Sequence, residues 1–219
     1  MLKYIIKKEF IVEFIGTFIF VLGILGIFYF AHFTWRPVLT GIFLMFVIFL
    51  FGEISGGHFN PAVTFGNWVL KRISSLRALA YVIVQFCGAY IAFVTAKILT
   101  CYYFERYIDW ARIFIPKINL SISYREFLAD VFGSIIFGLG IGKVLSSKYS
   151  HGFASMLTGL SLIMGLFISS LGRGGDLNPA LSLALSNLNI GNLFAPVIGI
   201  GFGVILSTYL FTKKLSSKS

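Results

Sequence analysis

Long apolar runs separated by short polar stretches dominate the pattern of this chain. Residues 10–30 contain one charged residue, Glu13, and residues 38–51 contain none. A bilayer core about 30 Å thick needs roughly 20 predominantly apolar residues per spanning helix. The pattern therefore predicts six transmembrane helices, within residues 10–30, 38–51, 81–99, 131–142, 153–171 and 193–212.

The apolar residues in these runs are continuous and do not alternate with polar ones. Strands of a transmembrane β-barrel do alternate, so a barrel is disfavoured. The first run is long and is followed by no small-residue cleavage site, so we interpret it as a helix of the mature protein and not as a signal peptide. The predicted fold class is an all-α membrane protein, with residues 1–219 forming one transmembrane domain.

The two halves of the chain resemble each other. "EFIGTFIFVLGI", which begins at Glu13, aligns without gaps with "DVFGSIIFGLGI", which begins at Asp130. Asn60 lies 47 residues after Glu13, and Asn178 lies 48 residues after Asp130. Each half has three apolar runs, an odd number, so the second copy enters from the opposite side of the membrane. We expect inverted repeats over about residues 9–101 and 123–212, joined by an outer loop over about residues 102–122.

Each half also carries an Asn-Pro-Ala tripeptide after a Gly-Gly pair, in "GGHFNPAVTF" and "GGDLNPALSL". Asn is a good N-cap, and Pro suits the first helical turn. The apolar stretches that follow, residues 62–70 and 180–188, are long enough for about half a membrane. We therefore predict two half-helices that meet at their N-termini, and the predicted pore motifs are Asn60, Pro61, Ala62, Asn178, Pro179 and Ala180.

Two helix N-termini that face one point direct partial positive charges of about +0.5 each at that point. The two Asn amides would donate hydrogen bonds to a passing oxygen atom. Half-helix dipoles of this kind oppose protons and cations in pores that pass water. The pattern thus predicts a barrier that a neutral, hydrogen-bonding solute can cross and an ion cannot.

Composition agrees with a membrane protein. Hydrophobic residues make up 58% of the chain and charged residues 12%. Ordinary soluble proteins have roughly 45–50% and about 25%. A soluble helical bundle, the alternative class, would need more surface charge.

The net charge of +10 is distributed unevenly. If six helices alternate in direction, 11 of the 18 basic residues fall on one side, which predicts cytoplasmic N- and C-termini. The opposite loops still carry basic residues, Arg36 and Arg173 among them. No basic patch interleaved with aromatic residues suggests nucleic acid as a partner.

The two cysteines suggest no chemistry of their own. Cys87 and Cys101 form no CxxC motif and have no His nearby in the sequence. We interpret both as packing residues, and we predict no metal site, no cofactor and no catalytic residue.

The segments "EFIGTF", "GEISGGHFNPAVTFG" and the second "NPA" resemble the motifs of aquaporins, in the major intrinsic protein family. The resemblance covers about residues 13–212. It implies a six-helix bundle with two re-entrant half-helices, one pore per subunit and a homotetramer in the cell membrane. It also implies that Asn60 and Asn178 are the central pore donors, and that Glu13 and Asp130 anchor the re-entrant loops through backbone N–H groups.

Equivalent positions differ at the two mouths of the predicted pore. We expect His58 to line the cytoplasmic vestibule, and Asp176 to lie at the outer mouth, where it would attract cations or hold Arg173. A merely packed His58 and a solvated or loop-capping Asp176 are the alternatives.

The outer constriction departs from the family pattern. The second family motif usually continues with an Arg that donates to the solute, and this chain has Leu181 there. By spacing from the two Asn residues, the other filter positions are Thr40, Leu166 and Gly175. This set resembles neither water-selective nor glycerol-conducting members. Ser182, where glycerol-conducting relatives usually carry Asp, favours the water type.

Three interpretations of this filter remain open. The constriction is wide and passes water together with glycerol or hydrogen peroxide; or it is apolar and closes by dewetting; or Arg173 folds back and replaces the missing charge. The alternative class of protein is a secondary transporter with broken helices, which would place acids at the breaks where this chain has Asn. An enzyme is not expected, because the chain has no nucleophile–base pair or phosphate-binding loop.

Overall fold

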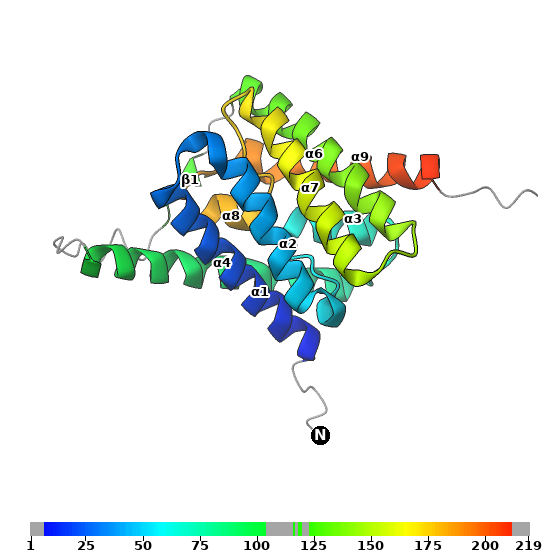
Figure 1. Ribbon diagram of the computed structural model, residues 1–219, viewed down its shortest axis with the longest axis horizontal. Coiled ribbons are helices and arrows are strands. Elements are labelled where there is room, and N and C mark those ends of the chain that lie inside the picture. Colours follow the sequence, from blue (N-terminus) through cyan, green and yellow to red (C-terminus); the bar gives the residue numbers. More distant parts are fainter. Residues whose placement is uncertain (1–6, 104–115, 117, 120–122, 212–219) are drawn as a thin grey trace, which may run out of the picture.

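The computed structural model describes residues 7–103, 116, 118–119 and 123–211. Within this part of the chain, six helices are long and apolar enough to cross a membrane (Figure 1), which confirms the predicted all-α membrane fold. Most of the predicted outer loop lies outside the described residues. The six long helices are α1 (Lys8–Phe30), α2 (Arg36–Ser55), α4 (Ser75–Tyr103), α6 (Tyr124–Leu145), α7 (His151–Ser170) and α9 (Ile190–Phe211).

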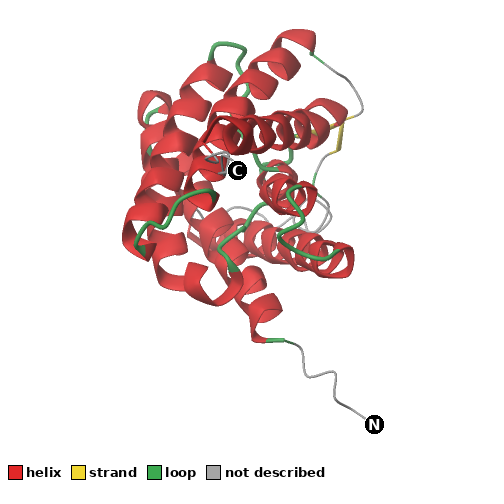
Figure 2. Cartoon of the chain, turned by 90° about the vertical axis from the view of Figure 1, so that its right-hand side faces the viewer, coloured by secondary structure: helices red, strands yellow, loops and turns green. Residues whose placement is uncertain are grey.

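Five short elements lie between the long helices: η1 (Phe33–Trp35), α3 (Pro61–Val69), β1 (Ile118–Asn119), α8 (Pro179–Ala184) and β2 (Leu188–Asn189). The strands pair in parallel, with Ile118 opposite Leu188. They lie at the edge of the helical bundle, in yellow in Figure 2. The hydrophobic pattern predicted no strand here, because a two-residue strand is too short to show alternation.

The helix contacts of the first half match those of the second. Helix α1 packs on α2 and α4, and α6 packs on α7 and α9. The short helices cross over between the halves, since α3 packs on α9 and α8 packs on α4. Helices α2 and α7 pack on each other and join the two halves. The short helices therefore lie inside the bundle, between the two sets of long helices.

Glycines allow the closest helix crossing between the halves. A Cβ atom added at Gly41 of α2 would lie 2.6 Å from the carbonyl oxygen of Gly159 in α7, and one added at Gly159 would lie 2.5 Å from that of Gly41. Only residues without side chains permit this approach of two backbones. The apolar side chains on the outside of the bundle, such as Phe46, Phe132 and Phe202, are more than half exposed and face the region a bilayer would occupy.

The second short helix is shorter than the sequence predicted. Helix α3 has nine residues, as expected, but α8 has six and ends with Leu185 as its C-cap. Both helices end at a left-handed residue, Lys71 (φ 56°) or Ser186 (φ 55°). After Ser186, the N–H of Asn187 closes the helix end by donating to the carbonyl of Ser182 at 2.9 Å. The chain then leaves the helix three residues earlier than in the first copy.

Candidate pore and its two vestibules

The two Asn-Pro-Ala tripeptides begin the two short helices. Asn60 is extended and its Oδ1 accepts the N–H of Ala62 at 2.8 Å, so it caps α3. The Oδ1 of Asn178 accepts the N–H of Ala180 at 3.0 Å and caps α8 in the same way. In both helices Pro occupies the first helical position, where its lack of an N–H costs nothing.

The two caps also bind each other. The Nδ2 of Asn60 donates to the carbonyl of Leu177 at 2.9 Å, and the Nδ2 of Asn178 donates to the carbonyl of Phe59 at 3.0 Å. The N-terminal ends of α3 and α8 are therefore adjacent. Since a side-chain amide has two N–H bonds, each Asn keeps one N–H that has no partner among the described residues.

The residue before each Asn has an unusual backbone conformation. Phe59 and Leu177 are left-handed, with φ of 45° and 44°, and both are fully buried. A left-handed conformation is unfavourable for residues with a Cβ and is kept only where the surroundings enforce it. Here it accompanies the cross-contacts in which these two carbonyls accept the opposite Asn amides.

Glu13 holds the first loop through both of its carboxylate oxygens. Oε1 accepts the Ser55 hydroxyl at 2.7 Å and the N–H of His58 at 2.9 Å. Oε2 accepts the N–H of Phe59 and the Nε2 of Gln85, each at 2.8 Å. The buried acid thus joins α1, α2, α4 and the loop before α3.

Asp130, the counterpart in α6, makes fewer contacts. Its carboxylate accepts a hydrogen bond from the Ser169 hydroxyl of α7. It also lies directly against Gly174, where an added Cβ would collide with it. Its carboxylate also accepts a backbone hydrogen bond from Gly175, three residues before Asn178. Asp is one methylene shorter than Glu, and among the described residues no bond joins Asp130 to the two residues directly before Asn178.

His58 lies within a polar cluster behind the first cap. Its Nδ1 is 3.1 Å from the hydroxyl of Thr64, and its ring meets that of Tyr81 edge-on at 5.2 Å. Gln85 donates to the same hydroxyl at 2.9 Å. His58 also lines a narrow vestibule of about 120 Å³, whose wall includes Gly56, Asn67 and His151.

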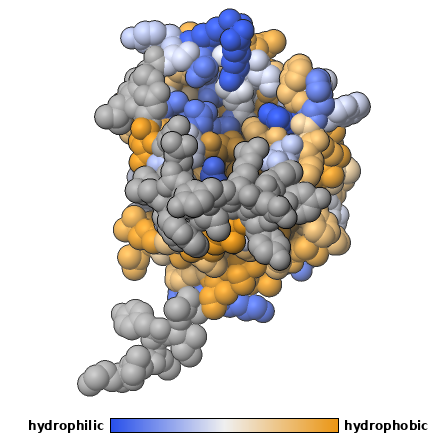
Figure 3. Space-filling view, turned by 90° about the vertical axis from the view of Figure 1, so that its left-hand side faces the viewer, coloured by the Kyte–Doolittle hydropathy of each residue, from blue (hydrophilic) through white to orange (hydrophobic). Residues whose placement is uncertain are grey.

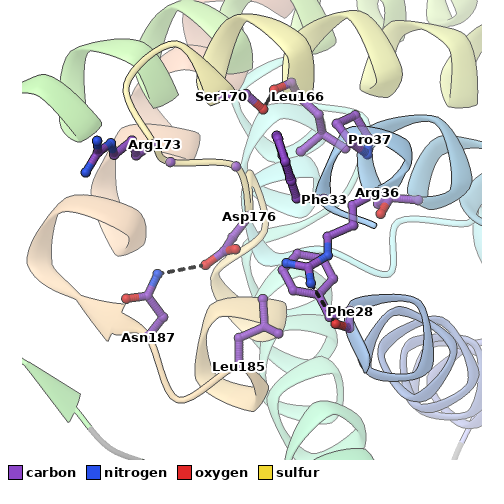
Figure 4. A pocket seen from close by; sticks show the side chains of 13 residues that line it. Phe28, Phe33, Arg36, Pro37, Leu166, Ser170, Arg173, Asp176, Leu185 and Asn187 are labelled. Carbon is purple, nitrogen blue, oxygen red and sulfur yellow. Dashed lines mark hydrogen bonds between the residues drawn. The ribbon is translucent and has the colours of Figure 1, made fainter. Parts of the chain in front are cut away.

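A wider vestibule of about 560 Å³ lies at the other end of the pore axis (Figure 4). Three of the four predicted filter positions line it: Thr40, Leu166 and Gly175. Leu181 does not line it and is only 2% exposed, within the hydrophobic core. Leu185, one turn further along α8, lines it instead.

The wall continues one helical turn beyond two of the predicted positions. Arg36 lies four residues before Thr40 on α2, and Ser170 lies four residues after Leu166 on α7; all four line the wide vestibule. Residues four apart share a helix face. Figure 3 shows hydrophilic residues mainly in the upper part of this view and hydrophobic ones at its sides and in its lower part.

The charged residues of the wide vestibule differ from the sequence-based expectation. Arg173 has a left-handed backbone (φ 69°) and its side chain points away from the cavity (Figure 4), so it does not fold back over the filter. The guanidinium group that lies beside the cavity belongs to Arg36. Asp176 is 8% exposed and accepts a hydrogen bond from Asn187 at 3.4 Å. Burial raises the pKa of the Asp176 carboxyl, and hydrogen bonds from Ser182 and Asn187 partly offset that rise.

Comparison with known proteins decides the family. Residues 2–207 match the family model described as "Major intrinsic protein". The chain belongs to the major intrinsic protein family. It is 30% identical over 86% of its length to "Aquaporin-3" of Milnesium tardigradum and spans 65% of that protein. It is 29% identical over 88% of its length to "Glycerol uptake facilitator protein-like 6" of Lactiplantibacillus plantarum, of which it covers 93%.

A solved structure supports the fold. The aquaglyceroporin of Plasmodium falciparum matches with a TM-score of 0.67 at 22% identity, over 95% of this chain and 96% of that one. Membership of the major intrinsic protein family makes this chain an integral membrane channel and not an enzyme. The secondary-transporter alternative is left without support. Among the described residues, no three His, Cys, Asp or Glu side chains cluster as metal ligands would.

Sequence reasoning missed several residues of this channel. Ser55, Gln85 and Ser169 bind the two buried acids, whose positions are 42, 72 and 39 residues away. Ser55 lies within "GEISGGHFNPAVTFG" and the other two in no motif, and none of the three was paired with an acid at such a distance along the chain. Arg36 was named only as a loop charge. Its four-residue spacing from Thr40 could have placed it on the vestibule wall.

Proposed function

We propose that this chain forms a passive channel for water and small neutral solutes such as glycerol, with hydrogen peroxide as a further candidate, and that it excludes protons and ions. The observation that carries the proposal is the pair of caps. One N–H of each Asn amide donates to the opposite loop and fixes the amide in place. The second N–H of each amide can donate to a passing oxygen atom. Cations would meet the positive ends of α3 and α8 at the same point.

In this proposal the two halves are inverted repeats, over about residues 9–101 and 123–212. The matched helix contacts and the crossed short helices support this arrangement. The wide vestibule would open to the outside and the narrow one to the cytoplasm, with both termini cytoplasmic, as the distribution of basic residues favours. A homotetramer with one pore per subunit is the assembly that the family resemblance suggests.

The names of two relatives mention glycerol, and the wide vestibule gives this chain room for a polyol. Its volume of about 560 Å³ far exceeds that of one water molecule, which is about 30 Å³. The filter positions Thr40, Leu166 and Gly175 carry no aromatic ring that would narrow it. We therefore place water and glycerol ahead of water alone.

A second candidate is a channel that is closed for most of the time by dewetting. The apolar side chain of Leu166, which lines the wide vestibule and is only 3% exposed, favours it, because an apolar constriction can exclude water without a gate. This candidate predicts water flow only slightly above that of a protein-free membrane.

The test uses purified protein in liposomes and light scattering after osmotic gradients of sucrose, glycerol and sorbitol. The proposal predicts water flow well above that of empty liposomes, glycerol uptake, and no sorbitol uptake. Slow water flow without glycerol uptake would favour the closed channel. Sorbitol uptake as fast as glycerol uptake would refute a selective pore.

A further inference from the structure

The cation beside the wide vestibule comes from α2, not from the segment after the second tripeptide. Arg36 begins α2, one turn before Thr40, and lines the vestibule together with Phe28 and Phe33 (Figure 4). Position 181, where the family motif usually continues with Arg, holds a leucine in the core. The vestibule therefore has a fixed positive charge from a different element.

The guanidinium group of Arg36 is held in place. Its Nη2 donates to the carbonyl of Phe28 at 2.8 Å and its Nε donates to the carbonyl of Ala31 at 3.3 Å. Its carbon Cζ lies 4.7 Å from the centre of the Phe28 ring. These contacts use carbonyls at the end of α1, which lack partners within their own helix. A planar group fixed by two hydrogen bonds and one ring has a defined direction.

The group still has capacity to bind. A guanidinium has five N–H donors, and the bonds to Phe28 and Ala31 leave three of them without a partner among the described residues. No carboxylate lies within ion-pair distance of Arg36 in the part of the chain that the structure describes, where the ion pair found is that of Arg77 with Glu9. Among the described residues, Arg36 thus has neither an acid that neutralises its charge nor partners for all its donors.

The surroundings suit a solute with both hydroxyl groups and carbon atoms. Phe28 and Phe33 give the wall beside Arg36 an apolar surface, and Arg36 supplies donors next to it. A small polyol can present oxygen atoms to the donors and C–H groups to the rings. A monovalent cation would be repelled by the same charge.

We propose that Arg36 is the specificity-determining cation of this pore: it charges the wide vestibule and donates to the hydroxyl groups of small polyols. The polyol part of this inference rests on the proposed channel function, whereas the charge part does not. Arg173 is the natural comparison, because it belongs to the same vestibule wall but its side chain points away.

The positive charge of the wide vestibule is tested on purified protein in detergent. This test does not require any solute to pass through the channel. Ser170 is exposed on the vestibule wall, so Ser170→Cys, in a chain with Cys87→Ser and Cys101→Ser, serves as the probe. Its reaction rates with an anionic sulfonate and a cationic trimethylammonium methanethiosulfonate are compared. One charge at about 8 Å in water favours the anionic reagent about fivefold. We expect this ratio to fall toward one in R36Q, and to persist in R36K and R173Q.

The polyol contacts are tested in liposomes. The ratio of glycerol to water permeability should fall about threefold in R36Q, as one charge-assisted hydrogen bond is lost, and should be unchanged in R173Q. If wild-type liposomes match empty ones, the proposed function fails, and the reagent ratio still decides the charge. A reagent ratio that R36Q leaves unchanged, or that R173Q lowers equally, would overturn the role of Arg36. If R36Q does not fold, R173Q alone decides. A reagent ratio that persists in R173Q supports Arg36 as the source of the charge, and a ratio that falls to one in R173Q refutes it.

Discussion

The loop before α3 and the loop before α8 carry the same cap but are held in place differently. In both, an Asn caps the helix and donates to the other loop, and a left-handed residue precedes it. The first loop is tied to Glu13 by two backbone N–H groups, while the second is tied to Asp130 by one, that of Gly175. The two loops thus make matching contacts where the caps meet and different contacts behind them.

The same difference extends to the two vestibules. The narrow one has His58 in a cluster of buried hydrogen bonds with Thr64 and Gln85. In the wide vestibule, Asp176 holds the equivalent position, and Arg36 lines the same cavity. We therefore expect the contacts shared by both halves to form the central barrier. We expect the contacts found in only one half to shape the vestibule on that side. The following predictions test this division.

The largest expected effect is that of E13Q, with D130N as its matched control. In the wild type, each carboxylate oxygen of Glu13 accepts two hydrogen bonds. A glutamine replaces one of these oxygens by an NH₂ group, which cannot accept, so at least one buried donor loses its partner. We expect a loss of about 2–4 kcal/mol in the free energy of unfolding for E13Q. Asp130 accepts from two donors, the Ser169 hydroxyl and the Gly175 N–H, where Glu13 accepts from four, and the amide oxygen in D130N can still accept one of them, so we expect a smaller loss of about 1–2 kcal/mol.

Thermal unfolding in detergent measures both variants. Equal losses of melting temperature in E13Q and D130N would contradict the division between the two anchors. So would a larger loss in D130N.

The second prediction concerns N60A and N178A. Each removes a helix cap and one hydrogen bond between the loops, at about 1 kcal/mol for each contact. Because the two caps make matching contacts, the variants should lose stability to within about 0.5 kcal/mol of each other. Their double variant should deviate from additivity, because each Asn binds the loop that carries the other. Strongly unequal losses in the two single variants would show that the caps are not equivalent.

The smallest effect is expected for D176N. Burial raises the pKa of Asp176 in the folded chain, so at pH values between the ordinary pKa and the raised one the folded state binds more protons than the unfolded state. The stability contributed by this group therefore falls as the pH rises from the ordinary pKa through the raised one. Melting temperatures from pH 4 to 8 should show the wild type losing about 2–4 °C relative to D176N as the pH rises. A wild type that gains on D176N instead would show that this carboxylate is stabilised in its charged form.

Much of this fold could be predicted because its signals are local. Six apolar runs gave six spanning helices, and Asn followed by Pro gave the start of each short helix. The predicted length of α8 was wrong because apolar residues continue past the end of this helix. The polar residues Ser186, Asn187 and Asn189 were the missed signal, since such residues favour left-handed and turn conformations.

The candidate site was harder to predict because its walls come from distant elements. Spacing from the two Asn residues placed Thr40, Leu166 and Gly175 around the wide vestibule. The same spacing could not show that Leu181 is buried in the core, or which arginine faces the cavity. The direction of the Arg36 side chain depends on its hydrogen bonds to the carbonyls of Phe28 and Ala31, where α1 ends, and the residue pattern alone does not specify these bonds.

The central claim is that the two facing caps pass neutral solutes and stop protons. Liposomes with the purified protein and a pH-sensitive dye inside test it most directly, with water flow measured by light scattering on the same preparation. The account predicts water flow well above that of empty liposomes, and a proton permeability equal to theirs. Proton permeability that rises in proportion to water flow, as the amount of protein per liposome is increased, would contradict it.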